Sequence, residues 1–200
     1  MKVKRMICGA FGTNTYLLEE NGDCLLIDPA CKAEKLFPLL EDKNLLGILL
    51  THGHFDHIKA CDDLYKKYNV PIYMSDKDKE LVSDNSQGRA FGLLNVPTIS
   101  SPITCLKEGM MNIGPFSFEV IYTPGHTKGS VCFLFKDFIF TGDTLFRGSI
   151  GRTDLRGGND SELKSSLRIF KGLDDDLIVY PGHDETSTIK DELANNLYLR

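Results

Sequence analysis

All five histidines of the chain lie in short motifs, and three of them fall within residues 51–57, which read Thr-His-Gly-His-Phe-Asp-His. The other two, His126 and His183, each follow a Pro-Gly pair. Every motif comes directly after an apolar run of the kind found in β-strands, at 47–50, 118–122 and 177–180. The pattern therefore predicts that the imidazoles gather at one edge of a sheet, as the ligands of a metal site.

The kinds of side chain in these motifs indicate a catalytic rather than a structural metal site. Asp56 stands inside the histidine segment, and Asp143 follows a further strand-like run in a Gly-Asp pair. Neutral imidazole and carboxylate suit zinc, iron and manganese, whereas structural zinc usually takes cysteines, which these motifs lack. His52 and His54 can point the same way from an extended chain, while Asp56 and His57 approach from another direction. One segment can therefore serve two metal ions.

Composition describes a soluble globular chain and excludes some classes of partner. With 42% hydrophobic and 26% charged residues, we expect one domain over residues 1–200 with a substantial core. A net charge of -5 does not suggest the broad basic face of a nucleic-acid binder. Residues 1–15 lack the apolar core of a signal peptide, and no apolar stretch could span a bilayer. We therefore expect a cytoplasmic protein without nucleic-acid or membrane partners.

The six cysteines are expected to be reduced residues of the core. They are widely spaced, include no Cys-x-x-Cys pair, and mostly lie in apolar, strand-like surroundings. A free cysteine behaves as a small buried apolar residue.

Strand-like and helical segments alternate along both halves of the chain. Strands are expected at 4–8, 15–18, 24–28, 47–51, 71–74, 103–106, 116–122, 130–135, 138–141 and 177–180. Helices are expected at 33–40, 62–68, 161–170 and 189–198. No repeat or linker divides the chain.

Residues 84–102 stand apart, because they form a long stretch of turn formers and small polar residues that encloses a few apolar side chains. One interpretation is a surface loop or short helix that caps the core. The other is a lid beside the metal site, in which case Phe91 and Leu94 would contact the substrate.

The order His-x-His-x-Asp-His, then His, Asp and His, resembles the metallo-β-lactamase superfamily over most of the chain. Within it, the segments Thr-Gly-Asp-Thr-Leu-Phe at 141–146 and Gly-Arg-Thr-Asp at 151–154 are similar to the glyoxalase II-like, or hydroxyacylglutathione hydrolase-like, branch. The resemblance implies an α/β fold, an αββα sandwich of two mixed β-sheets with helices on the outer faces and the metal site at one edge.

Carried onto this chain residue by residue, the resemblance implies two groups of ligands around a pair of divalent ions. His52, His54 and His126 would hold the first ion, Asp56, His57 and His183 the second, and Asp143 would bridge both. The ions, zinc in the first instance with iron or manganese as alternatives, would lie about 3.5–4 Å apart and share a hydroxide. That hydroxide would attack a small acyl thioester or ester such as S-lactoylglutathione, with Asp56 orienting the nucleophile.

The substrate-binding residues are less constrained. Two-domain glyoxalase II enzymes continue into a helical domain that helps to hold glutathione, whereas this sequence stops at Arg200, so we expect loose selectivity. Arg152 stands where the family has a glutathione-contacting lysine, and Asp154 where a tyrosine follows. Arg152 either grips a substrate carboxylate or pairs with Asp154. Lys128, close to His126, is either a second substrate contact or solvated surface charge.

Asp28, at the end of an apolar strand, is not expected to be a ligand. It is interpreted as a strand-end or capping carboxylate that can also support a metal-binding segment through a hydrogen bond. Thr51 and Thr144 are support candidates of the same kind.

Two other functions remain open. Persulfide dioxygenases resemble this chain at residues 151–154 and use a single iron held by two histidines and one aspartate, which would here be His52, His126 and Asp143. A non-catalytic metal-binding protein is the third class. Metal analysis combined with activity would separate the three. Two zinc-like ions with thioester cleavage would support the hydrolase, and one iron with oxygen uptake on glutathione persulfide would support the dioxygenase. Metal without turnover of either substrate would support the binding protein.

Overall fold

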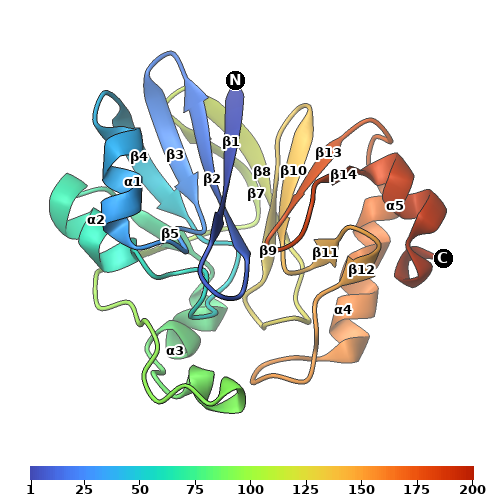
Figure 1. Cartoon of the computed structure of the whole chain (residues 1–200). Coiled ribbons are helices and arrows are strands. Elements are labelled where there is room, and N and C mark those ends of the chain that lie inside the picture. Colours follow the sequence, from blue (N-terminus) through green and yellow to red (C-terminus); the bar gives the residue numbers. More distant parts are fainter.

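Two six-stranded sheets pack face to face in the computed structural model, which describes all 200 residues (Figure 1). The first sheet contains, in spatial order, β1 (Lys2–Cys8), β2 (Thr13–Glu20), β3 (Asp23–Ile27), β4 (Asn44–Leu49), β5 (Ile72–Met74) and β6 (Ile103–Cys105). β1, β2 and β3 pair antiparallel, and β3 to β6 pair parallel. This sheet is therefore mixed, as expected.

The second sheet is also mixed and comes from the C-terminal half of the chain. Its spatial order is β14 (Ser187–Thr188), β13 (Ile178–Pro181), β10 (Phe138–Gly142), β9 (Val131–Leu134), β8 (Phe116–Tyr122) and β7 (Gly109–Ile113). Only β10 and β13 pair parallel. A separate hairpin joins β11 (Leu145–Phe146) to β12 (Ser149–Ile150).

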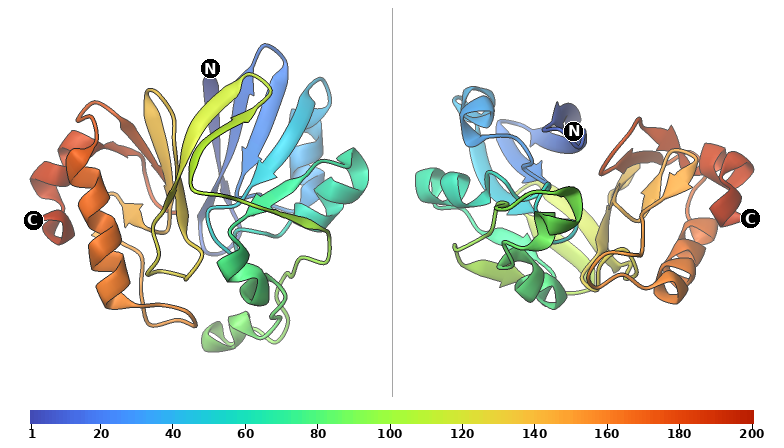
Figure 2. Two further views of the ribbon diagram at one scale, coloured as in Figure 1. Left: turned by 180° about the vertical axis from the view of Figure 1, so that it is seen from behind. Right: turned by 60° about the horizontal axis from the view of Figure 1, so that its bottom comes forward.

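Helices cover the outer faces of both sheets, which gives four layers (Figures 1 and 2). The α-helices are α1 (Ala33–Leu40), α2 (Cys61–Tyr68), α3 (Lys79–Val82), α4 (Asp160–Ser166) and α5 (Ile189–Asn195). The 3-10 helices are η1 (Asp76–Asp78), η2 (Gln87–Phe91), η3 (Leu167–Gly172) and η4 (Leu197–Leu199). None of these helices has the length and apolar character needed to cross a bilayer.

The apolar side chains form three clusters, one at each contact between layers. The cluster between the sheets is rich in aromatic rings, because strand β8 alternates Phe116, Phe118 and Val120 inward with polar residues outward. Strand β10 is buried along its whole length. Burying each large apolar side chain contributes roughly 1.5–3 kcal/mol. This packing fixes the two sheets against each other and thus sets where their strands end.

The expectation that all six cysteines are reduced core residues is wrong for three of them. Cys8 and Cys31 form a disulfide that joins the end of β1 to the segment before α1. Cys105 is exposed. Cys24, Cys61 and Cys132 are buried free thiols, and burial raises the pKa of Cys24 and of Cys132 to about 12.

Candidate metal centre

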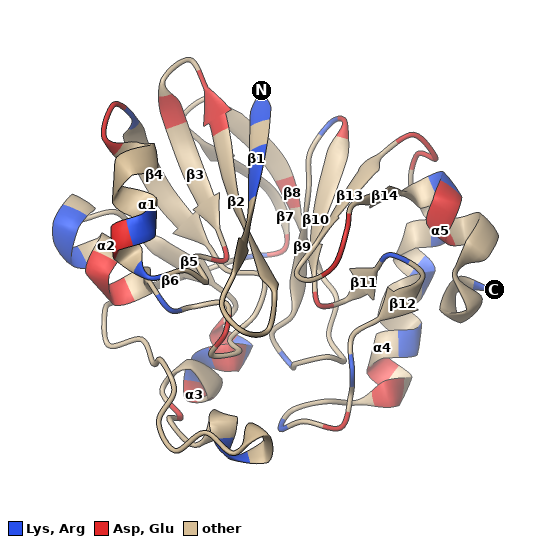
Figure 3. Cartoon of the chain, in the orientation of Figure 1, with Lys and Arg blue, Asp and Glu red and all other residues tan.

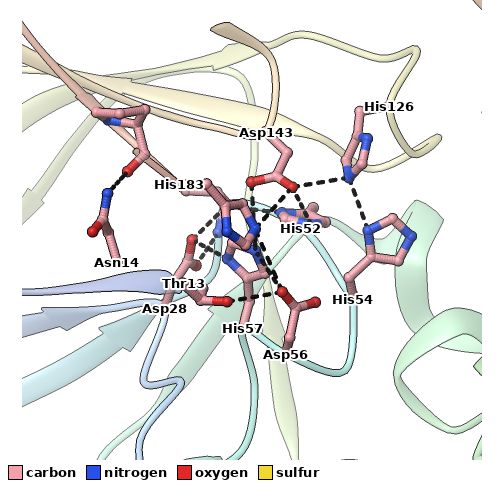
Figure 4. Close-up of polar contacts among 12 residues, drawn as sticks. Thr13, Asn14, Asp28, His52, His54, Asp56, His57, His126, Asp143 and His183 are labelled. Atoms are coloured by element: carbon pink, nitrogen blue, oxygen red, sulfur yellow. Dashed lines mark hydrogen bonds and ion pairs between the residues drawn. The ribbon is translucent and has the colours of Figure 1, made fainter. Parts of the chain in front are cut away.

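Four strands end at one edge of the sandwich, and each is followed by candidate ligands. β4 leads into segment 51–57, β8 into the loop with His126, β10 into Asp143, and β13 into His183. The apolar runs identified in the sequence are therefore strands, and the side chains that follow them converge (Figure 4).

Two glycines make this convergence possible. Gly142, directly before Asp143, has a φ of +49°, and a Cβ there would collide with the side chain of Thr51. A Cβ on Gly182 would collide with Asp143 Oδ1 and lie 2.9 Å from His57 Cε1. Any larger residue at either position would push the ligand-bearing segments apart.

The first group of candidate ligands consists of three buried imidazoles, those of His52, His54 and His126. Their ligand nitrogens lie within 4.8 Å of one another. His126 Nε2 is 2.8 Å from His54 Nδ1. Two ring nitrogens directed at each other at this distance are the arrangement expected of ligands that share an ion.

The second group combines a carboxylate with two imidazoles, Asp56, His57 and His183, whose ligand atoms also lie within 4.8 Å of one another. His57 Nε2 is 3.3 Å from His183 Nε2, and His183 Nε2 is 3.4 Å from Asp56 Oδ2. The side chains of Asp56 and His183 are 16% and 20% exposed, so this group opens toward solvent.

Asp143 lies between the two groups. Its Oδ2 is 3.3 Å from His126 Nε2 and 3.4 Å from His183 Nε2, and its Oδ1 is 3.4 Å from His57 Nε2. His52 Nε2 is 4.0 Å away. The structure thus brings all seven side chains singled out in the sequence into one cluster.

The polar atoms of the cluster fit divalent cations. His52 Nε2 and Asp143 Oδ1 are buried and have no hydrogen-bond partner in the protein. A buried polar atom left unpaired costs about 1–3 kcal/mol. Both atoms point into the cluster, where nitrogen and carboxylate ligands suited to zinc, iron or manganese already converge. The donor set is therefore appropriate for a pair of such ions.

Asp28 fixes two of the imidazoles. Its Oδ2 accepts hydrogen bonds from the hydroxyl of Thr51 at 2.6 Å and from His57 Nδ1 at 2.9 Å. Because the Thr51 hydroxyl donates to Asp28, its oxygen accepts from His52 Nδ1 at 3.0 Å. These contacts leave the Nε2 atoms of His52 and His57 directed at the cluster. The supporting role considered for Asp28 and Thr51 is confirmed by these contacts.

Backbone carbonyls fix two more rings in the same way. His126 Nδ1 donates to the carbonyl of Arg152 at 2.7 Å, and His183 Nδ1 donates to that of Phe11 at 3.0 Å. A carbonyl only accepts, so each contact sets the tautomer of its ring and leaves Nε2 as the ligand atom.

Asp78 is a buried carboxylate that sequence reasoning missed. Its oxygens accept hydrogen bonds from Gly53 N at 2.9 Å, Thr127 Oγ1 at 2.7 Å and Gly129 N at 2.8 Å. Burial raises the pKa of Asp78, while these hydrogen bonds oppose the rise. Asp78 therefore ties the loop of His52 and His54, which follows the first sheet, to the loop of His126 in the second.

Strand β2 supports the second group, a role that the sequence also did not reveal. Thr13 Oγ1 donates to Asp56 Oδ2 at 2.8 Å. The Asn14 side chain donates to the carbonyls of Pro181 and Asp184, on either side of His183, at 3.0 and 2.9 Å.

Burial keeps two imidazoles of the first group uncharged. Burial and the nearby His57 hold the pKa of His52 well below its usual range. Burial and His126 lower the pKa of His54 to about 3. Both rings therefore offer lone pairs at neutral pH.

Carboxylates dominate the second group. Burial lowers the pKa of His57, but Asp143, Asp56 and Asp28 outweigh it and raise that pKa to about 9. Burial is likewise outweighed at His183, where Asp143 and Asp56 raise the pKa to about 11. Against burial, the imidazoles lower the pKa of Asp56 to about 2 and hold that of Asp143 well below its usual range. The protein alone thus balances its carboxylates with protons that divalent cations would replace.

A cleft of about 630 Å³ opens over the candidate metal centre, where His54 and His126 of the first group, Asp56 and His183 of the second, and Asp143 contribute to its lining. Residues Asp84 to Phe91 form one side of its wall, and Ser149 to Arg156 form the other. Of the proposed substrate contacts, Phe91 and Arg152 line this cleft. Leu94 does not line it and is 87% exposed. Lys128 borders a separate hollow beside Lys77 and Glu162.

Segment 84–102 has features of both interpretations considered for it. Val96 and Ile99 are buried, and Ile99 packs into the cluster between the first sheet and its helices. Gln87 and Phe91, in η2, line the cleft. The segment therefore caps the core at one end and forms a wall of the cleft at the other.

The chain matches the family model of the metallo-beta-lactamase superfamily over residues 8–183. The probable metallo-hydrolase YqgX of Bacillus subtilis is 37% identical over 206 residues, which cover 100% of this chain and 98% of that protein. Hydroxyacylglutathione hydrolase GloC of Haemophilus influenzae is 37% identical over 208 residues, covering 100% of this chain and 98% of that protein.

Solved structures agree with these matches. The BLEG-1 B3 metallo-beta-lactamase superposes with a TM-score of 0.91 at 36% identity, covering 99% of each chain. TTHA1623 in a di-iron-bound form superposes with a TM-score of 0.91 at 37% identity, and the match covers 98% of this chain and 100% of that one. ETHE1 from Myxococcus xanthus superposes with a TM-score of 0.80 at 30% identity, and the match covers 98% of this chain and 84% of that one. In sequence, in fold and in the grouping of its histidines, this chain belongs to the metallo-beta-lactamase superfamily.

Proposed function

We propose that the protein is a binuclear metal-dependent hydrolase that cleaves a small acyl thioester or ester. The observation that carries this proposal is the position of Asp143, whose oxygens lie 3.3–3.4 Å from ligand nitrogens of both groups. A carboxylate has two oxygens and can therefore join two ions. His52, His54 and His126 would hold one ion and Asp56, His57 and His183 the other, with zinc as the first candidate and iron or manganese as alternatives.

The reaction adds water across the acyl bond: a C–O bond forms, the C–S or C–O bond to the leaving group breaks, and a proton of the water ends on the thiol or alcohol. A pair of divalent ions supplies a nucleophile at neutral pH and polarises the carbonyl. Asp56 remains ionised, with a pKa of about 2, and accepts a hydrogen bond from Thr13 at 2.8 Å. This contact holds the Asp56 carboxylate at the floor of the cleft, where it can orient the attacking water.

The relatives support a thioester as the first substrate to test. One is named a probable metallo-hydrolase and another a hydroxyacylglutathione hydrolase, each matching this chain over nearly its whole length. A close structural neighbour is described as a B3 metallo-beta-lactamase, so the fold alone does not select the substrate.

The direct test measures metal content and hydrolysis on the same sample. Protein loaded with zinc, iron or manganese should hold about two ions per chain, the number of a two-metal site. It should also release thiol from S-lactoylglutathione or other acyl thioesters. Two bound ions without hydrolysis of any thioester or ester would refute the proposal.

A persulfide dioxygenase is the second candidate, because residues 151–154 resemble that family. His126 and His52 lie 3.3 and 4.0 Å from Asp143, so these three could hold one iron. The second group of ligands would then have no role, which favours the hydrolase. One iron per chain with oxygen uptake on glutathione persulfide would instead support the dioxygenase.

A further inference from the structure

The cleft over the candidate metal centre contains two cationic side chains, and both are already paired. Arg152 binds Asp154 through two hydrogen bonds, Nε to Oδ1 and Nη2 to Oδ2, each 2.6 Å long. Arg156 Nη1 binds Asp84 Oδ2 at 2.6 Å across the cleft, and its Nη2 lies 3.7 Å from Glu80. No other lysine or arginine lines the cleft.

Acidic groups outnumber these cations in the outer part of the cleft, where Asp84, Asp154 and Asp184 all contribute to the lining. Basic and acidic positions alternate along the segment between β12 and α4 (Figure 3). A substrate carboxylate would have to displace Asp154 from Arg152. Asp154 is attached two residues away, so its effective concentration at the guanidinium is high. Once displaced, Asp154 would repel the incoming anion.

An apolar wall faces the same space. Phe11, Phe55 and Phe91 come from three separate segments and meet edge to face, with ring centroids 5.4 Å apart for Phe11 and Phe55 and 5.2 Å apart for Phe11 and Phe91. Phe11 and Phe91 are 40% and 37% exposed, and all three rings line the cleft. The Arg152 guanidinium lies 5.7 Å from the Phe91 centroid, so this ring also helps to hold Arg152 beside Asp154.

We propose that the cleft selects substrates whose group beside the scissile bond is uncharged and apolar, and disfavours substrates that carry carboxylates there. The rings of Phe11, Phe55 and Phe91 pack against the apolar group of the substrate. Asp154 determines specificity because its carboxylate already binds the Arg152 guanidinium, which is then not free to bind a substrate carboxylate. The inference rests on the proposed hydrolase function for its substrate class. Its test separates binding from turnover.

The test uses one ligand in two charge states. S-benzylglutathione and its diamide have the same size and no thioester carbonyl, and they differ only in whether two groups are carboxylates or carboxamides. Calorimetric titration of the metal-loaded protein should show tighter binding of the diamide. The Asp154→Asn variant should shift the affinity ratio toward the carboxylate form by about two- to fivefold, the range of an exposed ion pair. Adding Arg152→Gln to Asp154→Asn should remove that shift.

Matched variants control for charge and for the apolar wall. Asp176→Asn removes one exposed acid away from the cleft and should leave the ratio unchanged. Phe91→Ala should weaken binding of the diamide about fivefold, the equivalent of roughly 1 kcal/mol. Leu94 belongs to the same segment but lies outside the cleft, so Leu94→Ala should leave binding of the diamide unchanged.

The same pair of charge states can be compared as substrates. With S-lactoylglutathione and its diamide, kcat/KM should follow the order found in binding. If neither is hydrolysed but the binding order holds, the proposed function fails and the inference about ligand class stands. The inference would be overturned if the unmodified protein bound the carboxylate form more tightly than the diamide. It would also be overturned if Asp154→Asn and Asp176→Asn had the same ratio of affinities for the two ligands.

Discussion

The two groups of candidate ligands differ in chemistry although they share Asp143. His52, His54 and His126 are all imidazoles and all buried, and burial lowers the pKa of His52 and of His54. The other group contains a carboxylate and opens to the cleft, and its two imidazoles have pKa values raised to about 9 and 11. His52 and His54 are therefore neutral before an ion binds, whereas His57 and His183 hold protons.

Because of this difference, we expect ions bound by the two groups to differ in their affinity. An ion in the first group meets lone pairs that are already available on His52 and His54, while an ion in the second must replace protons on His57 and His183. The first group is more deeply buried, whereas Asp56 and His183 of the second are partly exposed, and side chains of both groups line the cleft. We therefore expect the first group to hold its ion more firmly and the second group to be the more sensitive to conditions.

The largest effect is expected from Asp143→Ala, because this residue contacts both groups. Loss of an outer partner of a metal ligand typically costs about 10–100-fold in affinity or activity, and loss of the shared ligand should exceed that. Elemental analysis should find fewer than two ions, and hydrolysis should nearly disappear. Full metal content with undiminished activity would remove Asp143 from the centre.

Single ligands should separate the groups. His126→Ala and His183→Ala should each lose about one of the two ions of such a site. Competition with a chelator should strip the remaining ion more slowly from His183→Ala, which keeps the buried group intact. If both variants lost both ions together, the two groups would form a single site and the comparison would fail.

The buried acids that support each group offer a finer test. Asp28 and Asp78 each accept hydrogen bonds on both oxygens, so an asparagine would place a donor against a donor. Asp28→Asn should weaken binding of the second ion most, by about 10–100-fold, because Asp28 contacts His57 directly and His52 only through Thr51. Asp78→Asn should destabilise the fold by about 1–3 kcal/mol and weaken binding of the ion by the first group.

Metal titration and chemical denaturation would measure these effects, with Asp176→Asn as the exposed control. If both variants lost the two ions equally, Asp28 would not act mainly on the second group, nor Asp78 mainly on the first.

The smallest effect concerns pH and the metal-free protein. The pKa values of His57 and His183 are about 9 and 11, above their ordinary value of 6.5. Their protonation therefore stabilises the fold fully below about pH 6.5, and this contribution is lost as pH rises through 9 and 11. With chelator present, Tm should fall between pH 7 and pH 10, by roughly 2–4 °C for each 1 kcal/mol lost in a chain of this size.

His183→Ala should show a shallower decline in Tm, because it lacks one of the two groups. A decline as steep as that of the unmodified protein would assign the pH dependence to other residues.

The sequence predicted the strand ends well because each ligand follows an apolar run that pairs in a sheet. Helix α1 matches the predicted range, and the mixed sheets match the expected fold. Strand β7 was missed, since of its five residues two are exposed and only Ile113 is buried, which leaves little apolar patterning. The second sheet therefore has an edge strand that its sequence does not announce.

Contacts between distant segments were beyond prediction. Asp78 lies in a run of charged residues typical of the surface, yet its partners are 25–51 residues away. The disulfide joins two cysteines 23 residues apart that share no motif. Leu94 was chosen as an apolar residue within a polar segment, and Lys128 because it lies close to His126 in the chain, but neither side chain lines the cleft. Metal binding by the seven clustered side chains stays a prediction.

The separation of the ligands along the chain gives the centre an order of assembly. His54 and His126 are 72 residues apart, and His57 and His183 are 126 apart, so neither group can form until both sheets have docked. During synthesis, every residue of the buried group and Asp143 emerges before β13 and His183. The second group is therefore the last to be completed, and the two-ion centre that we propose cannot form until β13 has joined the second sheet.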